Sequence, residues 1–435
     1  MKPNDKIYCD YLKILKEELI PATGCTEPIA VAYAAAKARE LLGTLPESCT
    51  ITVSGNIIKN VKSVVVPNTN GLRGISAAVA AGVIAGNASR KLEVLADIKE
   101  TDKTRMLEYM ETHPITVVPA DNDIVFYIAA TLKNGTDEAT VVIEQYHTNI
   151  VHMTRSGKTL YDSGSGSKEK TRLTDRSCLN VQDIVDFSDS VRIEDISEVI
   201  GQQIDYNAAI SVDGLKNNWG ANIGKVLLSA YGNDVRTRAR AAAAAGSDAR
   251  MGGCEKPVVI VSGSGNQGMT ASLPVIEYAK ELHVSRDKLY RAVVLSDLVT
   301  IYQKTGIGRL SAFCGAVSAG CGAGAGIAYL YGGDYDVIAH TIVNTLAITS
   351  GIVCDGAKPS CAAKISAAVD AGILGYNMYK NDQQFLSGDG IVTKGVDNTI
   401  HNVGVLAKKG MRQTDREIIK IMLGQTQECT NASVD

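Results

Sequence analysis

The spacing of apolar side chains along the first 45 residues predicts two helices separated by a short break. Residues 6–20 carry apolar side chains at intervals of three and four, which is the period of a helix with one buried face. Pro21 interrupts this run, and a second helical run follows over Ile29–Leu42. The break itself contains Ala22–Pro28, a segment with one cysteine, Cys25.

Between Cys49 and Tyr161 the apolar period shortens to two, which predicts β-strands. A turn over Lys133–Asp137 separates two of these strands and indicates an antiparallel meander. The predicted strands are 50–54, 61–66, 115–118, 124–132, 139–144 and 149–153, and the helices between them are 75–88 and 101–112. We therefore expect a mixed α/β N-terminal domain with a largely antiparallel sheet.

Beyond residue 178 the pattern is mainly helical and rich in Gly and Ala, with one strand at 258–261. The predicted helices are 180–187, 197–212, 223–230, 236–245, 289–304, one from about 311, 335–350, 362–374 and 414–423. The uncharged span Leu310–Gly333 reaches membrane length, but it consists mainly of Gly, Ala and Ser. We expect a close-packed internal helix there.

A polar, glycine-rich and charged stretch at 162–177 predicts a domain boundary or a mobile loop. The expected fold class is α+β, and we divide the chain into three parts. These are 1–44 with the N-terminal helices and the Cys25 motif, 45–165 as the mixed α/β domain, and 178–435 as a mainly helical domain with paired cysteines. The polar end, 424–435, is expected to fray.

Composition narrows the class of partner. The chain has 435 residues and a formal net charge of −3, with no long basic run, which argues against nucleic-acid binding. The N-terminus lacks the apolar core of a signal peptide, so we expect a cytoplasmic protein whose ten cysteines are reduced. A small-molecule substrate is the expected partner, without nucleic acid or membrane, and a homo-oligomer stays open.

Two pairs of cysteines stand out, because each pair is seven residues apart: Cys314 with Cys321, and Cys354 with Cys361. Thiolates in a reducing compartment favour zinc or iron–sulfur ligation, with ligands gathered from distant segments. The alternative is that these cysteines are small buried apolar residues.

Cys25 stands where a reactive cysteine is expected. Thr26 is a suitable N-cap and Pro28 suits the first helical turn, so Cys25 should lie at the positive end of a helix dipole. There the pKa of a thiol falls below its ordinary value. The alternative is an ordinary capping turn with an incidental cysteine.

A glycine-rich turn, Ser262–Gly268, follows the strand at 258–261 and leads into a helix. Its spacing matches the dinucleotide fingerprint only formally, because no acid-ended strand follows and Pro274 should break the helix. The backbone N–H groups of such a turn bind an anion, and Ser264, Asn266 and Gln267 are candidate substrate-binding residues. The alternative is a tight turn without a ligand.

A second polar cluster surrounds His147 and Asn149, close to a strand start. A histidine there can hold a carboxylate or relay a proton, so both residues are candidates for substrate binding. The alternative is a histidine that bonds only to a backbone carbonyl.

Taken together, these motifs resemble the L-cysteine desulfidase family, which is related to the iron–sulfur L-serine dehydratases. The matching segments run in order along nearly the whole chain: 21–28, 147–152, 247–253, 262–268, 309–314, 354–361 and 413–416. The resemblance implies a lyase without pyridoxal phosphate that converts L-cysteine and water to pyruvate, ammonia and hydrogen sulfide.

The same resemblance implies a [4Fe–4S] cluster held by Cys314, Cys354 and Cys361, with Cys25 as proton acceptor. Cys321 matches no ligand of the family. Three protein ligands leave one iron open as a Lewis acid, whereas a fourth would close the cluster.

Three alternatives remain open at this stage. The first is L-serine as substrate, with the same chemistry and water as leaving group. The second is a non-catalytic sensor or binding protein that carries a cluster. The third is a nicotinamide oxidoreductase that uses Gly263–Gly268.

Overall fold

The structure of the protein is a computed structural model that describes residues 1–163 and 173–425. Its sheet-forming strands are β2 (Ser48–Val53), β3 (Ile115–Pro119), β4 (Tyr127–Asn134), β5 (Asp137–Glu144), β6 (Ile150–Arg155) and β7 (Lys158–Asp162). The strand order is β3-β2-β4-β5-β6-β7, and only β2 and β3 run parallel. The expectation of a largely antiparallel sheet is confirmed.

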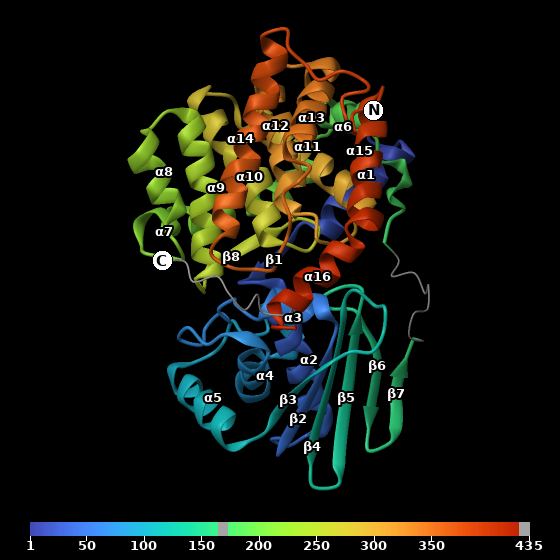
Figure 1. The fold of residues 1–435 in the computed structure, drawn as a ribbon, viewed down its shortest axis with the longest axis vertical. Coiled ribbons are helices and arrows are strands. Elements are labelled where there is room, and N and C mark those ends of the chain that lie inside the picture. The colour runs from blue at the N-terminus through green and yellow to red at the C-terminus, as the bar shows by residue number, and fades with distance from the viewer. Residues whose placement is uncertain (164–172, 426–435) are drawn as a thin grey trace, which may run out of the picture.

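Helices cover one side of this sheet and form the rest of the molecule (Figure 1). Those near the sheet are α2 (Thr26–Leu42), α3 (Gly55–Val61), α4 (Gly74–Ala85) and α5 (Glu100–Thr112). The helical part contains α1 (Lys6–Glu18), α6 (Val181–Ser190), α7 (Ile193–Lys216), α8 (Ile223–Tyr231), α9 (Val235–Met251), α10 (Gly265–Glu281), α11 (Arg286–Ile307), α12 (Gly315–Leu330), α13 (Tyr335–Thr349), α14 (Cys361–Lys380) and α15 (Val396–Val405). The α+β fold class is thus confirmed.

A pair of short strands and the C-terminal helix lie where the sheet end meets the helical end. Strand β1 (Ile20–Thr23) pairs antiparallel with β8 (Pro257–Ile260). The C-terminal helix α16 (Arg412–Met422) packs against α3, and Figure 1 shows it between the two ends of the molecule. The division into three domains stays a prediction, and residues 164–172 of the expected boundary loop lie outside the described residues, as do 426–435 of the polar end.

Helix α12 is buried among α10, α11, α13 and α14, as expected for an internal helix. Its glycines allow backbones to touch: a Cβ added at Gly372 in α14 would lie 2.3 Å from the carbonyl oxygen of Gly320 in α12. No helix in residues 1–163 or 173–425 combines the length and the apolar character needed to cross a membrane.

Two expectations about local structure were wrong. Residues 61–66 do not form a strand. Val61 is the last residue of α3, and the residues after it make only an isolated bridge, between Val65 and Arg73. Pro274 does not break the helix but lies inside α10. The Ala271 carbonyl, in the turn before the proline, accepts a hydrogen bond from the Ser296 hydroxyl of α11, so a tertiary contact holds this part of the helix. Pro21 lies in β1, and α1 ends before it, as expected.

The close contact of α12 with α14 predicts that Gly372→Ala lowers the free energy of unfolding by about 2 kcal/mol, because the added methyl group overlaps a backbone oxygen. Gly351→Ala is the matched control, since no atom lies within 4 Å of its added Cβ, and it should change stability by less than about 0.5 kcal/mol. Urea unfolding of both variants measures the difference. Equal stability of the two variants would contradict the packing described here.

Candidate active site

Three cysteines from two distant segments line one cavity of about 100 Å³: Cys314, Cys354 and Cys361. Backbone hydrogen bonds join the segments, because Cys314 N–H donates to the Ile352 carbonyl at 3.1 Å and Cys354 N–H donates to the Ala312 carbonyl at 2.6 Å. Cys25 lines the same cavity. The four residues expected from the resemblance therefore lie together.

Cys321 lies elsewhere, as its failure to match a family ligand implies. It is buried on α12, where its thiol faces the Ile342 carbonyl at 3.7 Å, and it does not line the cavity. It behaves as the small buried residue of the alternative interpretation.

Helix N-termini surround this cavity. Cys25 is the N-cap of α2, Ser264 of α10 and Cys314 of α12, while Cys361 is the first residue of α14. All four residues line the cavity. Because the N-terminus of a helix carries partial positive charge and free N–H groups, this arrangement favours an anionic occupant.

The donor set fits an iron–sulfur group. Burial first, and then the neighbouring Cys354, raise the pKa of Cys314 to about 12, so its thiolate needs a cation beside it. Within the described ranges, no three His, Cys, Asp or Glu side chains are arranged to hold a single metal ion. In a cluster each thiolate binds a different iron, so its ligands do not share one coordination sphere.

The expectation of a lowered thiol pKa at Cys25 was wrong. Burial, and then the carboxylate of Glu27, raise the pKa of Cys25, and these effects exceed that of the helix dipole. Its Sγ donates a hydrogen bond to Glu27 Oε2 at 3.3 Å. Thr26 is not the N-cap; its hydroxyl instead donates to the Gly263 carbonyl at 2.9 Å and joins the two motifs.

Glu27 connects Cys25 with the polar cluster around His147. Asn60 Nδ2 donates to Glu27 Oε1 at 3.3 Å, and His147 Nε2 lies 3.9 Å from the same oxygen. Burial alone would raise the pKa of Glu27, but His147 and Arg250 outweigh it and lower this pKa to about 2, so Glu27 carries a negative charge. His147 lines the cavity.

The glycine-rich turn contributes Ser264, Asn266 and Gln267 to the cavity, as expected. The chain enters this turn with Ser262 and Gly263 at φ 48° and 83°, a conformation that favours glycine at the second position. Asn149 does not reach the cavity, because its amide donates to the Glu144 carbonyl at 2.9 Å. Its expected role in substrate binding has no support from this geometry.

Buried polar atoms around the cavity lack hydrogen-bond partners in the described part of the chain. They are Asn60 Oδ1, His147 Nε2, Arg250 Nη2 and Gln267 Oε1. An unsatisfied buried polar atom costs about 1–3 kcal/mol, so a native protein rarely keeps several in one place without a ligand. The cavity therefore has the features of a binding site for a polar molecule.

Sequence reasoning missed Glu27 and Arg250. Both lie within segments that carried the resemblance, and both are charged residues among small or apolar neighbours. A charged residue in such a context is seldom buried without a partner, and this signal could have identified both.

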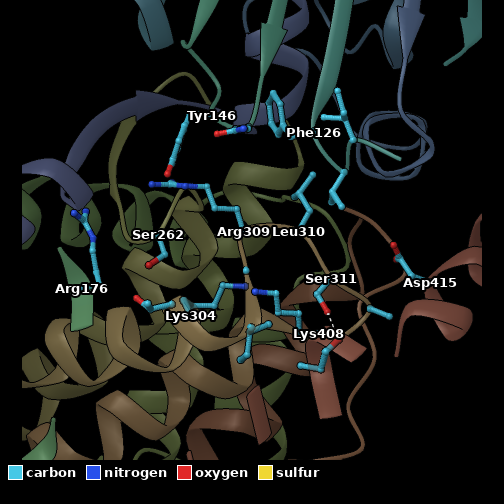
Figure 2. Close-up of a pocket in the computed structure, with 18 of the residues that line it drawn as sticks. Phe126, Tyr146, Arg176, Ser262, Lys304, Arg309, Leu310, Ser311, Lys408 and Asp415 are labelled. Atoms are coloured by element: carbon cyan, nitrogen blue, oxygen red, sulfur yellow. Dashed lines mark hydrogen bonds between the residues drawn. The ribbon is translucent and has the colours of Figure 1, made fainter. Parts of the chain in front are cut away.

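A larger cavity of about 830 Å³ adjoins the small one (Figure 2). The two share the residues Ser262, Lys304, Arg309, Leu310 and Ser311. Figure 2 shows Arg309 directed toward Tyr146, and the guanidinium carbon lies 4.4 Å from the ring centroid. Arg309 Nη2 also donates to Glu18 at 3.1 Å. The larger cavity thus lies directly beside the one that the thiols line.

The C-terminal helix supports the loop of Cys354 through a buried lysine. Lys59 Nζ lies 2.5 Å from Asp415 Oδ1 of α16 and donates to the Cys354 carbonyl at 3.4 Å. The Lys59 side chain is 1% exposed. A buried ammonium that loses its carboxylate is strongly destabilising.

Comparison with known proteins gives the family of this chain. The family model described as serine dehydratase alpha chain matches residues 89–420. The chain therefore belongs to the serine dehydratase alpha chain family, which implies a lyase that acts on a small molecule. The expected relation to iron–sulfur L-serine dehydratases is confirmed at this level, and the match does not distinguish L-cysteine from L-serine.

Similar proteins include several UPF0597 proteins. One from Desulfitobacterium hafniense (strain Y51) is 60% identical over 425 residues, which cover 98% of this chain and 99% of the relative. One from Lachnoclostridium phytofermentans is 50% identical, with 96% and 100% covered, and one from Treponema denticola is 45% identical, with 95% and 97% covered.

The Lys59 contact predicts that Asp415→Asn lowers the free energy of unfolding by about 3 kcal/mol, because a buried ammonium loses its counter-charge. Asp123→Asn is the matched control, since the Asp123 side chain is 83% exposed beside Arg412, and its effect should stay below about 1 kcal/mol. Chemical denaturation compares the variants. A small effect at Asp415 would show that the buried pair is not required.

Proposed function

We propose that this protein is an iron–sulfur-dependent lyase that converts L-cysteine and water to pyruvate, ammonia and hydrogen sulfide. The observation that carries the proposal is the position of Cys25, Cys314, Cys354 and Cys361 around one cavity, in a chain of the serine dehydratase alpha chain family. The reducing cytoplasm that we expect for this chain would keep these thiols available for iron.

Cys314, Cys354 and Cys361 would hold a [4Fe–4S] cluster. When bound, such a cluster supplies an open iron that acts as a Lewis acid toward the leaving group or the carboxylate of the substrate. The four helix N-termini at the cavity favour the negative charge that thiolate ligands bring. Cys25 and Cys314 are buried and Cys361 is partly buried, so water has limited access to these thiols.

Cys25 is the proposed acceptor of the substrate's α-proton. In the cavity its own proton is directed toward Glu27 Oε2. That proton must leave before Cys25 can act as a base, and the positive charge of the substrate's ammonium group favours the thiolate. Loss of the α-proton and of the β-thiol gives aminoacrylate, which takes up water and yields pyruvate and ammonia.

L-serine is the second candidate substrate, and the description of the matching family favours it. The same residues would remove the α-proton, and water would leave in place of hydrogen sulfide. An anaerobic assay of pyruvate from each amino acid, with sulfide measured in parallel, separates the two. If kcat/KM is higher for L-serine, L-serine replaces L-cysteine as the proposed substrate. If neither amino acid gives pyruvate, the proposal of a lyase is rejected.

The proposed ligand set predicts that Ser substitution at 314, 354 or 361 abolishes stable iron binding, because a hydroxyl is a much poorer iron ligand than a thiolate. Cys321→Ser is the control, since its thiol lies outside the cavity, and it should keep the wild-type iron content. Iron and acid-labile sulfide are counted per chain after anaerobic reconstitution. Full iron content in any of the three variants removes that residue from the set.

The proposed role of Cys25 predicts a different result for Cys25→Ser. Iron and sulfide content should stay at the wild-type level, while kcat falls by about 10²–10⁴-fold because the base is lost. Metal analysis and the pyruvate assay on one sample measure both quantities. Retention of most of the activity would assign proton removal to another group.

A further inference from the structure

Two buried groups of opposite charge line the small cavity without contacting each other. Arg250 belongs to α9 and is 2% exposed, and Glu27 belongs to α2 and is 8% exposed. Neither residue was among the candidate substrate-binding residues identified from the sequence. Burial of an ion normally requires a partner of opposite charge close by.

Arg250 makes no ion pair at contact distance within residues 1–163 and 173–425, although its charge acts on Glu27 from further away and lowers the pKa of that carboxyl. Its Nε donates to the Gly24 carbonyl at 3.0 Å and its Nη1 donates to Asn266 Oδ1 at 3.2 Å, and both acceptors are neutral. Its Nη2 is buried and has no hydrogen-bond partner. The guanidinium is therefore held in place by neutral groups, while one of its nitrogens remains free to donate to an anion.

Glu27 is held in a comparable way. Its Oε2 accepts hydrogen bonds from Cys25 at 3.3 Å and Thr26 at 3.2 Å, and its Oε1 accepts one from Asn60 at 3.3 Å. These neutral donors fix the carboxylate beside Cys25, and His147 Nε2 lies 3.9 Å from Oε1. The Oδ1 atom of Asn60 is buried without a partner, which adds a second acceptor next to the Glu27 carboxylate.

We propose that Arg250 binds the α-carboxylate and Glu27 binds the α-ammonium group of a free α-amino acid. Asn266 orients the Arg250 guanidinium, Gln267 of the same turn adds a polar contact, and Asn60 Oδ1 accepts from the ammonium. Binding would give each buried charge an opposite charge at contact distance, where the described chain offers Arg250 no ion pair and offers Glu27 only His147 at 3.9 Å. This inference rests on the proposed function, whose substrates are α-amino acids.

Two-point binding has a consequence for the chemistry. The α-carbon carries both charged groups, so fixing the carboxylate at Arg250 and the ammonium at Glu27 leaves this carbon between them. Cys25 is hydrogen-bonded to Glu27 and is thus next to the ammonium position. The α-hydrogen is then presented to Cys25, which is the orientation that proton removal requires.

The same arrangement defines the substrate class. Simple carboxylic acids lack the group that Glu27 binds, and amino-acid amides lack the group that Arg250 binds. Either would leave one buried charge uncompensated, which disfavours binding strongly. Peptides are excluded for the same reason, since each has only one of the two charges at a given residue.

The test uses L-alanine, because it has both charges but no leaving group and so cannot be turned over. Isothermal titration of the full chain, reconstituted anaerobically with iron and sulfide, compares L-alanine with propionate and L-alaninamide. We expect propionate and L-alaninamide to bind at least about tenfold more weakly than L-alanine. Equal binding of the three, or no binding of L-alanine at millimolar concentration, overturns the inference.

Two variants test the assignment of each charge. Arg250→Met should lose binding of both L-alanine and propionate, because both use the carboxylate subsite. Glu27→Gln should lose the preference for L-alanine over propionate, because only the ammonium subsite has changed. The matched controls are Arg236→Met on α9 and Glu40→Gln on α2, which lie on the same helices but outside the cavity, and both should keep the wild-type preference.

Failure to fold is addressed by a conservative variant. Arg250→Lys keeps the positive charge, so it should retain the preference for L-alanine with weaker affinity, and thermal unfolding verifies that each variant is folded. If a folded Glu27→Gln variant still prefers L-alanine over propionate as the wild type does, the inference is overturned, even if the wild-type protein converts L-cysteine. Conversely, the expected selectivity without any turnover supports these two subsites and rejects only the lyase.

Discussion

The candidate site depends on the close approach of two helix backbones. Helices α12 and α14 touch through Gly320, Gly324 and Gly372, and a Cβ at any of these positions would overlap backbone atoms of the other helix. Both helices begin at the cavity, one after Cys314 and the other at Cys361. The contact between the helices therefore sets the separation of two thiols, and small residues far from the cavity control its geometry.

A second feature follows from the direction of the helices. Four of them point their N-termini at the cavity, which also contains the unpaired guanidinium of Arg250 and the ammonium of Lys304. Burial lowers the pKa of Lys304 to about 8, so it is still largely charged near neutral pH. Glu27 is a negative charge at the same cavity and interacts with Arg250. The balance favours an occupant with negative charge, such as thiolate-bound iron or a carboxylate.

The amphipathic helices, the meander and the strand at 258–261 followed from apolar period alone. The strand predicted at 61–66 was wrong. A run of valines is compatible with a strand or with a buried loop, and the packing of the surrounding helices decides between them. Pro274 was misjudged because α10 is packed against α9, α11 and α12, and this packing is invisible in local sequence. Lys158–Asp162 and Val396–Val405 received no assignment.

Motifs identified most of the candidate site, but they did not identify its electrostatics. The resemblance brought out the cysteines and the glycine-rich turn, since these residue types occur at recognisable spacing. The direction of the Cys25 pKa depended on burial and on Glu27, and neither quantity can be obtained from helix position alone. Asn149 was favoured by residue type, yet a backbone carbonyl two residues before Tyr146 uses its amide.

Residues from both ends of the molecule line the cavity, so the geometry of the site depends on how the two ends pack against each other. Cys25, Glu27, Asn60 and His147 come from the elements at the sheet end, whereas Arg250 and the three clustered thiols come from the helical end. Lys59 bridges them, since it bonds to Asp415 of α16 and to the carbonyl of Cys354. Loosening this junction would move a thiol and the proposed base relative to each other before either end unfolds. Local stability at the junction is therefore a condition for the geometry of the site.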